Sequence, residues 1–291
     1  MESTTYALPA TPKQIAYARL LALRNQTLLP WEVQQDRRSL SAWIDAQAKL
    51  NPGAQDSRPT SKQVAFAERL GAPVVTTEMG RGAISEDHKL AVGLIGHFGR
   101  TTANEALRRA DVVIGLGCRF TNVSTINWSV IPENTKIIQV EAEPLEIGRQ
   151  YSVEIGIAAD SGAFLTDALT YCNSEGILDD RGADHPRAQA LAELNDQESA
   201  RYFDVDMDSV PIKAQLITRA IMEVCEEDVI VSVGAGNHTQ YAHHIKIRRP
   251  DSYILPAGTG SMAFAFAAAL GARLAQPDRQ IVVPIGDGDF G

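Results

Sequence analysis

The sequence predicts an α/β protein: a doubly wound central domain with a parallel sheet, then an incomplete second α/β domain, both preceded by a small all-helical segment. Two observations predict the α/β parts. Short β-branched runs alternate with helical segments from Gly71 onward, and the alternation resumes near Pro211 after a polar interval, as expected for parallel strands joined by right-handed crossovers. A third observation separates the beginning, because the first 70 residues show helical periodicity only. The predicted parts are 1–69 (helical segment), 70–172 (central domain), 173–210 (linker) and 211–291 (second domain, truncated).

The composition is that of an ordinary soluble globular protein. A chain of 291 residues with 44% hydrophobic content is long enough for two domains with their own cores. No apolar run approaches the roughly 20 residues that span a bilayer, and the first residues lack signal-peptide features, so we expect no membrane association and a cytoplasmic location. Three scattered cysteines argue against a disulfide framework, and the absence of a CxxC pair argues against zinc.

Charge is distributed unevenly along the chain. The net charge is −9, but residues 1–70 carry nine Lys/Arg against six Asp/Glu, a net of +3, which leaves −12 for the remainder. An acidic body repels phosphates and argues against general nucleic-acid binding. Contact with nucleic acid therefore stays open only through residues 1–69.

The first predicted helix covers residues 11–24. Its apolar residues recur at helical spacing, with Thr11 as N-cap and Pro12 at the first helical position. Lys13–Ala18 recurs as Lys62–Ala67, an internal repeat at a spacing of 49 residues. This repeat resembles the small helical repeats at the C-terminal ends of some bacterial topoisomerase III-like proteins, and the alternative is a simple helical cap or linker.

A second helix is predicted from Trp31 to Leu50, and Asn51-Pro52-Gly53 would end it. Its pattern turns one set of side chains inward and a charged set outward. The inward set is Val33, Leu40, Trp43 and Ile44, and the outward set is Asp36, Arg37 and Arg38.

The central domain is predicted to alternate strands and helices. The first helix after Gly71 would be capped by Thr101 or Thr102. In chain order the elements are a strand at 73–77, a helix at 102–110, strands at 112–117 and 136–140, and a helix at 161–171.

Residues 173–210 are polar and acidic, and we interpret them as a linker with one exposed helix. The second α/β domain follows in the same alternating style. Its elements are a helix from 211 to 225, strands at 228–233 and 252–255, a small-residue helix at 262–274, and a strand at 280–283.

Three strand-to-loop turns of this second domain, 234–238, 257–262 and 286–291, are rich in glycine and small residues. Parallel strands would bring them to one edge of the sheet, where one pocket could use all three. Backbone amides near Gly258 and Gly260 would favour an anion, and Asp287 between glycines offers a hard oxygen ligand for Mg²⁺. Each signal also has an ordinary structural explanation, such as a tight turn.

His238 and Asn237 extend the same prediction. The imidazole can donate to a phosphate oxygen or take part in proton transfer, and the amide offers a donor or an acceptor. A surface histidine after a turn is the alternative.

From about Leu70 to Gly291 the chain resembles the thiamine-diphosphate enzymes of the acetolactate synthase and benzoylformate decarboxylase group. The motifs that carry the resemblance are TTEMGRGAISEDHKLAVGLIGHFG (76–99), ADVVIGLGCRF (110–120), KIIQVEAEPLEIGRQY (136–151), VSVGAGNHTQYA (231–242), ILPAGTGSMAFAFAAALGARLAQPDR (254–279) and PIGDGDFG (284–291).

The resemblance implies thiamine diphosphate and Mg²⁺ as cofactors and a 2-oxo acid as substrate, for decarboxylation or carboligation. Asp287 would be the metal ligand, and His238 would serve in catalysis as well as at the diphosphate. Gly260 would offer its carbonyl to the aminopyrimidine, and Met262 would hold the cofactor bent. The implied cofactor-binding set is Gly236, Asn237, His238, Gly258, Gly260, Ser261, Met262, Gly286, Gly288 and the Asp289 amide.

Departures from the family pattern concern the missing parts. No Glu in the N-terminal segment matches the activating acid of the family's pyrimidine-binding domain, and the Asn that completes its metal site would lie beyond Gly291. We therefore expect a truncated or split chain, a fragment or a subunit, that is inactive alone and works as a homo-oligomer or with a partner supplying the pyrimidine-binding domain.

Two alternatives remain at this stage. One is a non-catalytic binding or assembly module whose N-terminal helices contact nucleic acid or protein. The other is FAD in the central domain, for which Gly115, Gly117 and Arg119 lie at a plausible strand end, although a tight loop explains such a turn equally well.

Overall fold

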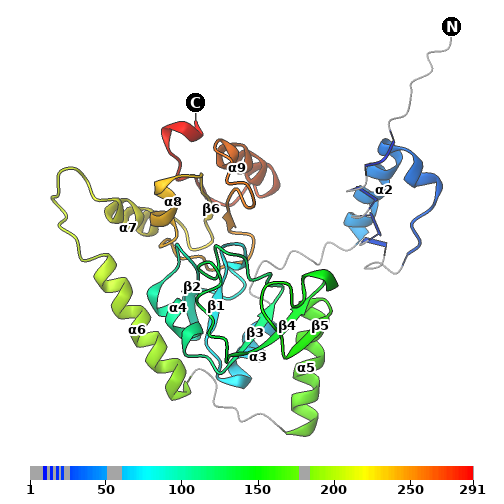
Figure 1. Cartoon of the computed structure of the whole chain (residues 1–291). Coiled ribbons are helices and arrows are strands. Elements are labelled where there is room, and N and C mark those ends of the chain that lie inside the picture. Colours follow the sequence, from blue (N-terminus) through cyan, green and yellow to red (C-terminus); the bar gives the residue numbers. More distant parts are fainter. Residues whose placement is uncertain are drawn as a thin grey trace. The chain divides into compact units, whose positions relative to one another are not determined.

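The computed structural model describes residues 9–11, 14–15, 18–19, 21–22, 27–50, 61–176 and 184–290 (Figure 1). By its contacts the chain forms two compact units, Met1–Asp56 and Ser57–Gly291. In the described part of the chain, no helix is long and apolar enough to cross a membrane. The four-part division predicted from the sequence stays a prediction.

The first unit begins with the predicted helix. Its described residues between 14 and 22 are helical, and Ala18 is fully buried. The Thr11 hydroxyl accepts from the Gln14 amide (3.2 Å), while the Gln14 side-chain oxygen accepts from the Thr11 amide (3.1 Å). This reciprocal pair is a capping box, so Thr11 caps the helix as predicted. Pro12 and the turn at 51–53 lie outside the described residues.

The helix predicted over 31–50 is divided into a 3₁₀ turn, η1 (Glu32–Gln35), and α2 (Arg37–Leu50). Asp36 between them has extended backbone, and its carboxylate accepts from the amides of Arg38 (3.1 Å) and Ser39 (2.8 Å). An Asp that caps the following helix interrupts the preceding one. Asp36 was therefore wrongly predicted to lie within a continuous helix.

The second unit opens with the central elements, in which parallel pairing is confirmed: β1 pairs with β2, and β3, β4 and β5 form a second sheet in that order. β2 and β5 were not predicted, because each is four residues long and contains a glycine that weakens the strand pattern. The elements are α3 (Ser61–Leu70), β1 (Val74–Thr76), η3 (Glu78–Gly80), β2 (Ala91–Leu94), α4 (Thr101–Arg108), β3 (Val112–Leu116), β4 (Lys136–Glu141), η4 (Pro144–Glu146), β5 (Ile155–Ala158) and α5 (Ser161–Glu175).

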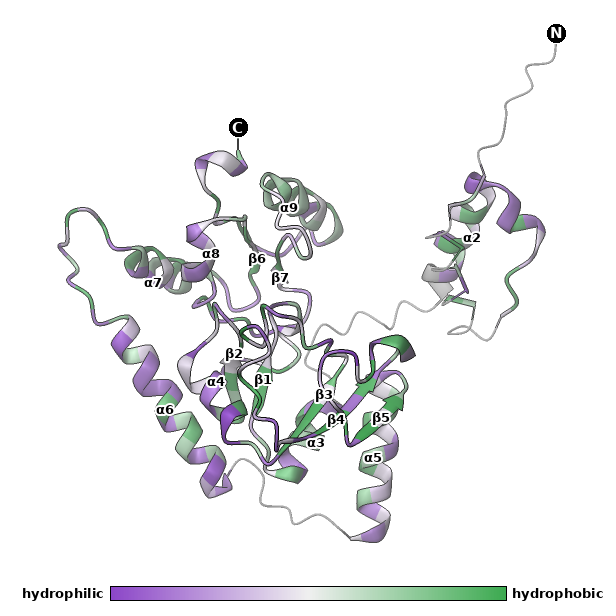
Figure 2. Cartoon of the chain, in the orientation of Figure 1, coloured by the Kyte–Doolittle hydropathy of each residue, from purple (hydrophilic) through white to green (hydrophobic). Residues whose placement is uncertain are grey.

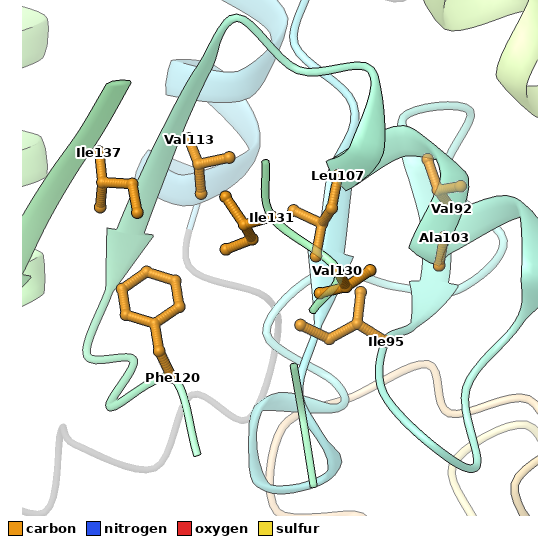
Figure 3. Close-up of a cluster of buried hydrophobic side chains, with 9 residues drawn as sticks. All are labelled: Val92, Ile95, Ala103, Leu107, Val113, Phe120, Val130, Ile131 and Ile137. Carbon is orange, nitrogen blue, oxygen red and sulfur yellow. The ribbon is translucent and has the colours of Figure 1, made fainter. Parts of the chain in front are cut away.

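One buried cluster joins α4 to both sheets and to the segment before β4. Its side chains point toward one another in Figure 3 and form a buried hydrophobic core of the central elements. Alternation along β3 sends Val113 inward and leaves Val112 half exposed. The cluster comprises Val92, Ile95, Ala103, Leu107, Val113, Phe120, Val130, Ile131 and Ile137.

The start of α4 differs from the prediction. Arg100 is the N-cap residue and makes no side-chain cap. Instead, the Glu198 carboxylate accepts from the amides of Thr101 (2.7 Å) and Thr102 (2.8 Å). Neither threonine is the cap that was predicted, because a carboxylate from a distant helix satisfies the free N–H groups.

The remaining elements complete the α/β pattern. The helix predicted within 173–210 is α6, which packs on α4 through contacts such as that of Glu198, and Figure 2 shows hydrophilic and hydrophobic residues interspersed along it. The third sheet has the order β7-β6-β8, all parallel. The elements are α6 (Pro186–Tyr202), α7 (Ala214–Val224), β6 (Ile230–Ser232), α8 (Asn237–Ala242), β7 (Tyr253–Ile254), α9 (Phe264–Ala275), β8 (Ile281–Val282) and η6 (Asp287–Asp289).

A buried ion pair joins the central elements to the segment between α8 and β7. Arg81 donates to both carboxylate oxygens of Glu86 (2.8 and 2.9 Å) and to the Ile245 carbonyl (2.6 Å). Glu86 also accepts from the Ile247 amide (3.1 Å), and the guanidinium lies 4.4 Å from the Tyr253 ring centre. A bidentate buried pair of this kind fixes the segment after α8.

Removing Glu86 should therefore be costly. Glu86→Ala leaves the Arg81 guanidinium buried without its counter-ion, and we expect a loss of about 3 kcal/mol or more in the free energy of unfolding. The control is Asp87→Ala, which breaks partly exposed ion pairs with Lys246 and Arg248 and should cost less, about 1 kcal/mol or under for each pair. Urea unfolding measures both, and equal losses would contradict this account.

His243, at the end of α8, gives the fold a predictable response to acid. Its side chain is 1% exposed and lies 3.3 Å from a Glu78 oxygen. Burial, with Arg81 nearby, lowers the pKa of His243 to about 3. The folded state thus binds the proton less readily than the unfolded state, whose histidine has a pKa of about 6.5.

The folded state should consequently lose stability as the pH falls from about 6.5 toward 3, by up to ~5 kcal/mol from this residue, and should show no such penalty above that range. His243→Gln should flatten the dependence of the unfolding midpoint on pH between 7 and 4. His97→Gln, at an exposed position, should leave it unchanged. An unaltered acid slope in the His243 variant would disprove the assignment.

Candidate functional site

The third sheet brings the three predicted turns to one edge. β6 lies between β7 and β8, and both neighbours run parallel to it. The segments that follow the three strands, 233–238, 255–263 and 283–289, therefore leave from the same edge. Ligands of open parallel sheets bind at this edge.

Asp289 connects the three turns. Its side chain is 1% exposed, and one carboxylate oxygen accepts from the amides of Ala263 (3.0 Å) and Ala235 (3.4 Å). The other oxygen accepts from the Gly286 amide (3.3 Å). Three backbone N–H groups, one from each turn, thus converge on one negative charge, which shows that this edge stabilises an anion.

His238 lies in the first turn of α8, next to this carboxylate. Its Nε2 is 3.4 Å from the second Asp289 oxygen, without the geometry of a hydrogen bond and without another partner among the described residues. A Cβ added to Gly236 would lie 2.9 Å from the imidazole ring. The glycine therefore allows the ring to lie close against the turn. The region 234–238, predicted as a turn, contains the beginning of this helix, which was not predicted.

The middle turn has free space around its two glycines. Gly258 and Gly260 have φ values of +89° and +63°, and an added Cβ would meet nothing within 4 Å at either. Glycine is required there by backbone conformation and not by crowding. Met262 is 63% exposed, and its sulfur lies 3.3 Å from the position of a Cβ on Gly288. Ser261 shares a hydrogen bond with Thr259 (3.0 Å).

Asp287 and Asp289 differ in surroundings. Asp287 is exposed, and its carboxylate accepts no hydrogen bond from the described residues. In the described part of the chain, no group of three or more His, Cys, Asp or Glu side chains could hold a metal ion. Asp287 thus offers one carboxylate to a cation, and its role as Mg²⁺ ligand stays a prediction.

The site as a whole fits an anionic cofactor better than a metal alone. The amides of Ala235, Ala263 and Gly286 already donate to Asp289. The groups that suit a diphosphate are therefore the histidine with an unpartnered nitrogen and the open glycine turn. Asn237 begins α8 beside them. The role predicted for Asp289 concerns only its backbone amide, and no local sequence pattern reveals that its side chain reaches Ala263.

The strand end suggested for FAD has a structural explanation at one glycine. A Cβ on Gly115 would lie 2.6 Å from the Phe120 ring, so close packing accounts for this residue. Gly117, with φ of +60°, and Arg119 are exposed. FAD binding stays a prediction.

Comparison with known proteins now identifies related sequences. Residues 51–168 match the model of the "Thiamine pyrophosphate enzyme, central domain", and residues 234–291 match that of the "Thiamine pyrophosphate enzyme, C-terminal TPP binding domain". The two matched segments together cover more than half of the chain.

Curated relatives agree. The chain is 33% identical to a probable acetolactate synthase large subunit of Methanococcus aeolicus over 77% of its own length and 39% of the relative. It is 33% identical to the Methanocaldococcus jannaschii counterpart over 77% and 38% of the two chains. The acetolactate synthase large subunit of Haemophilus influenzae is 29% identical over 88% of this chain and 45% of its own length. The chain thus spans less than half the length of these relatives, and through its two matched domains it belongs to the thiamine pyrophosphate enzyme family.

Proposed function

We propose that this chain contributes the central and diphosphate-binding domains of a thiamine-diphosphate- and Mg²⁺-dependent enzyme that decarboxylates or ligates 2-oxo acids. The observation that carries the proposal is the convergence of three turns on one anion-stabilising centre at the edge of the β7-β6-β8 sheet. The family to which the chain belongs and its acetolactate synthase relatives support it.

Each turn has a distinct part in the proposal. The backbone N–H groups of Asn237 and His238 and the glycine turn around Gly286 and Gly288 would bind the diphosphate. Asp287, whose carboxylate accepts no hydrogen bond from the described residues, would hold the cation. His238 would donate to a phosphate oxygen or hold a proton beside it.

The middle turn would orient the organic part of the cofactor. Gly260 would offer its carbonyl oxygen, and the exposed Met262 would pack against the rings. When bound, thiamine diphosphate supplies the nucleophilic carbon and the electron sink that the cleavage of a 2-oxo acid needs.

We further propose that the chain works as a homo-oligomer or with a partner subunit in the cytoplasm and has little activity alone. Mg²⁺ held by Asp287 would take its other oxygen ligands largely from the diphosphate and from water, so the need for a partner rests on the activating acid. By the resemblance, the glutamate that activates the cofactor belongs to the pyrimidine-binding domain, which a partner would supply.

Binding of the cofactor tests the first proposal. Calorimetry should detect thiamine diphosphate with Mg²⁺, and Asp287→Ala should weaken this binding by about tenfold or more, because one charged ligand of the cation is lost. Asp278→Ala, at another exposed carboxylate, is the matched control and should bind like the wild type. No binding, together with salt-sensitive affinity for DNA, would instead favour a non-catalytic module acting through its N-terminal helices.

Turnover tests the second proposal. Purified chain with thiamine diphosphate and Mg²⁺ should show little or no release of CO₂ from pyruvate or benzoylformate, because by the resemblance the activating acid belongs to a domain that a partner would supply. Robust turnover by the chain alone would refute the need for a partner.

A further inference from the structure

We propose that the Asp289 side chain is a positioning residue that clasps the three turns of the site and sets their spacing before the cofactor arrives. The inference deepens the proposed function and, for its effect on binding, rests on it. It goes beyond the role predicted from the sequence, in which only the Asp289 amide was considered.

The clasp is built from contacts that span the domain. Oδ1 accepts from Ala263, 26 residues away in the chain, and from Ala235, 54 residues away, while Oδ2 accepts from Gly286 in its own turn. Because each donor belongs to a different strand end, one carboxylate fixes the relative positions of all three. No other described side chain accepts hydrogen bonds from all three turns.

A carboxylate is the side chain that suits these donors. All three partners are N–H groups, and an ionised Asp is an acceptor at both oxygens, whereas Asn would turn an NH₂ group toward a donor. Hydrogen bonds from backbone amides to a charged group are stronger than neutral ones. The same donors compensate the burial of the charge.

The clasp also explains two backbone features around it. A Cβ on Gly234 would lie 2.1 Å from the second carboxylate oxygen of Asp289, so only glycine leaves room for the acid at this position. Ala263 has φ of +62°, a conformation that favours glycine. Its N–H is held by Asp289 directly before α9 begins, which stabilises the strained residue.

The consequence for ligand binding follows from preorganisation. Turns that are fixed before binding lose less conformational entropy when the diphosphate binds. His238 shares this arrangement, since its ring lies 3.4 Å from the carboxylate. Loss of the clasp should thus loosen the turns in the free protein and weaken the binding of the cofactor.

The experiment compares Asp289→Ala, Asp289→Asn and Gly234→Ala with the wild type, with Asp278→Asn as a control for the loss of one surface charge. The first readout needs no ligand: hydrogen exchange of the Ala263 and Gly286 amides, measured by NMR. We expect exchange about tenfold faster or more in Asp289→Ala and Gly234→Ala, an intermediate effect in Asp289→Asn, and unchanged exchange in the control. The Val231 amide, paired inside the sheet, should keep its protection in all variants, which excludes general unfolding.

The second readout is calorimetric binding of thiamine diphosphate with Mg²⁺, which should weaken about tenfold or more in the same two variants and less in Asp289→Asn. Unchanged exchange at Ala263 and Gly286 in Asp289→Ala would overturn the clasp, even if the wild type binds the cofactor. Absence of binding by the wild type would overturn the proposed function, whereas the exchange measurement would still decide the clasp.

Discussion

Parallel pairing of β6 with both β7 and β8 is the constraint on which the candidate site depends. Paired segments are only two or three residues long, so the ladder alone cannot fix the long turns that follow. The buried carboxylate of Asp289 supplies the missing connection, because it accepts hydrogen bonds from a residue after each of the three strands. The sheet topology thus places the three turns at one edge, and the Asp289 side chain fixes their positions relative to one another.

α8, which carries His238, is held near both ends, by the end of β6 at its start and by the central elements at its end. Thr239 near the start of the helix donates to the Gly234 carbonyl (2.7 Å), which ties the helix to the end of β6. At its end, His243 is buried near Glu78, and the following segment is held by Arg81 and Glu86. His238, in the first turn of α8, thus belongs to a helix that is held near both of its ends.

The sequence was sufficient to predict those features that depend on hydrophobic periodicity and on the connection of neighbouring elements. The alternating elements, the parallel sheets and the shared edge of the three turns follow from β-branched runs and helical spacing. The sequence was insufficient where a side chain forms its hydrogen bonds outside the pattern of its own segment. Glu198 caps α4 in place of either threonine, and Asp36 interrupts a helix that its periodicity favoured. The Asp289 side chain was overlooked for the same reason, since its partners are up to 54 residues away.

The two acidic residues of the GDGD turn show how environment separates similar side chains. Asp289 is buried and its oxygens already accept three backbone N–H groups, so a cation there would have to compete with those donors. Asp287 is exposed and accepts no hydrogen bond from the described residues, so its oxygens are free for a hard cation. Two residues apart, one carboxylate holds three turns of the protein together and the other is open to a ligand. Of the two acidic residues of this turn, only Asp287 has carboxylate oxygens that accept no hydrogen bond from the described residues.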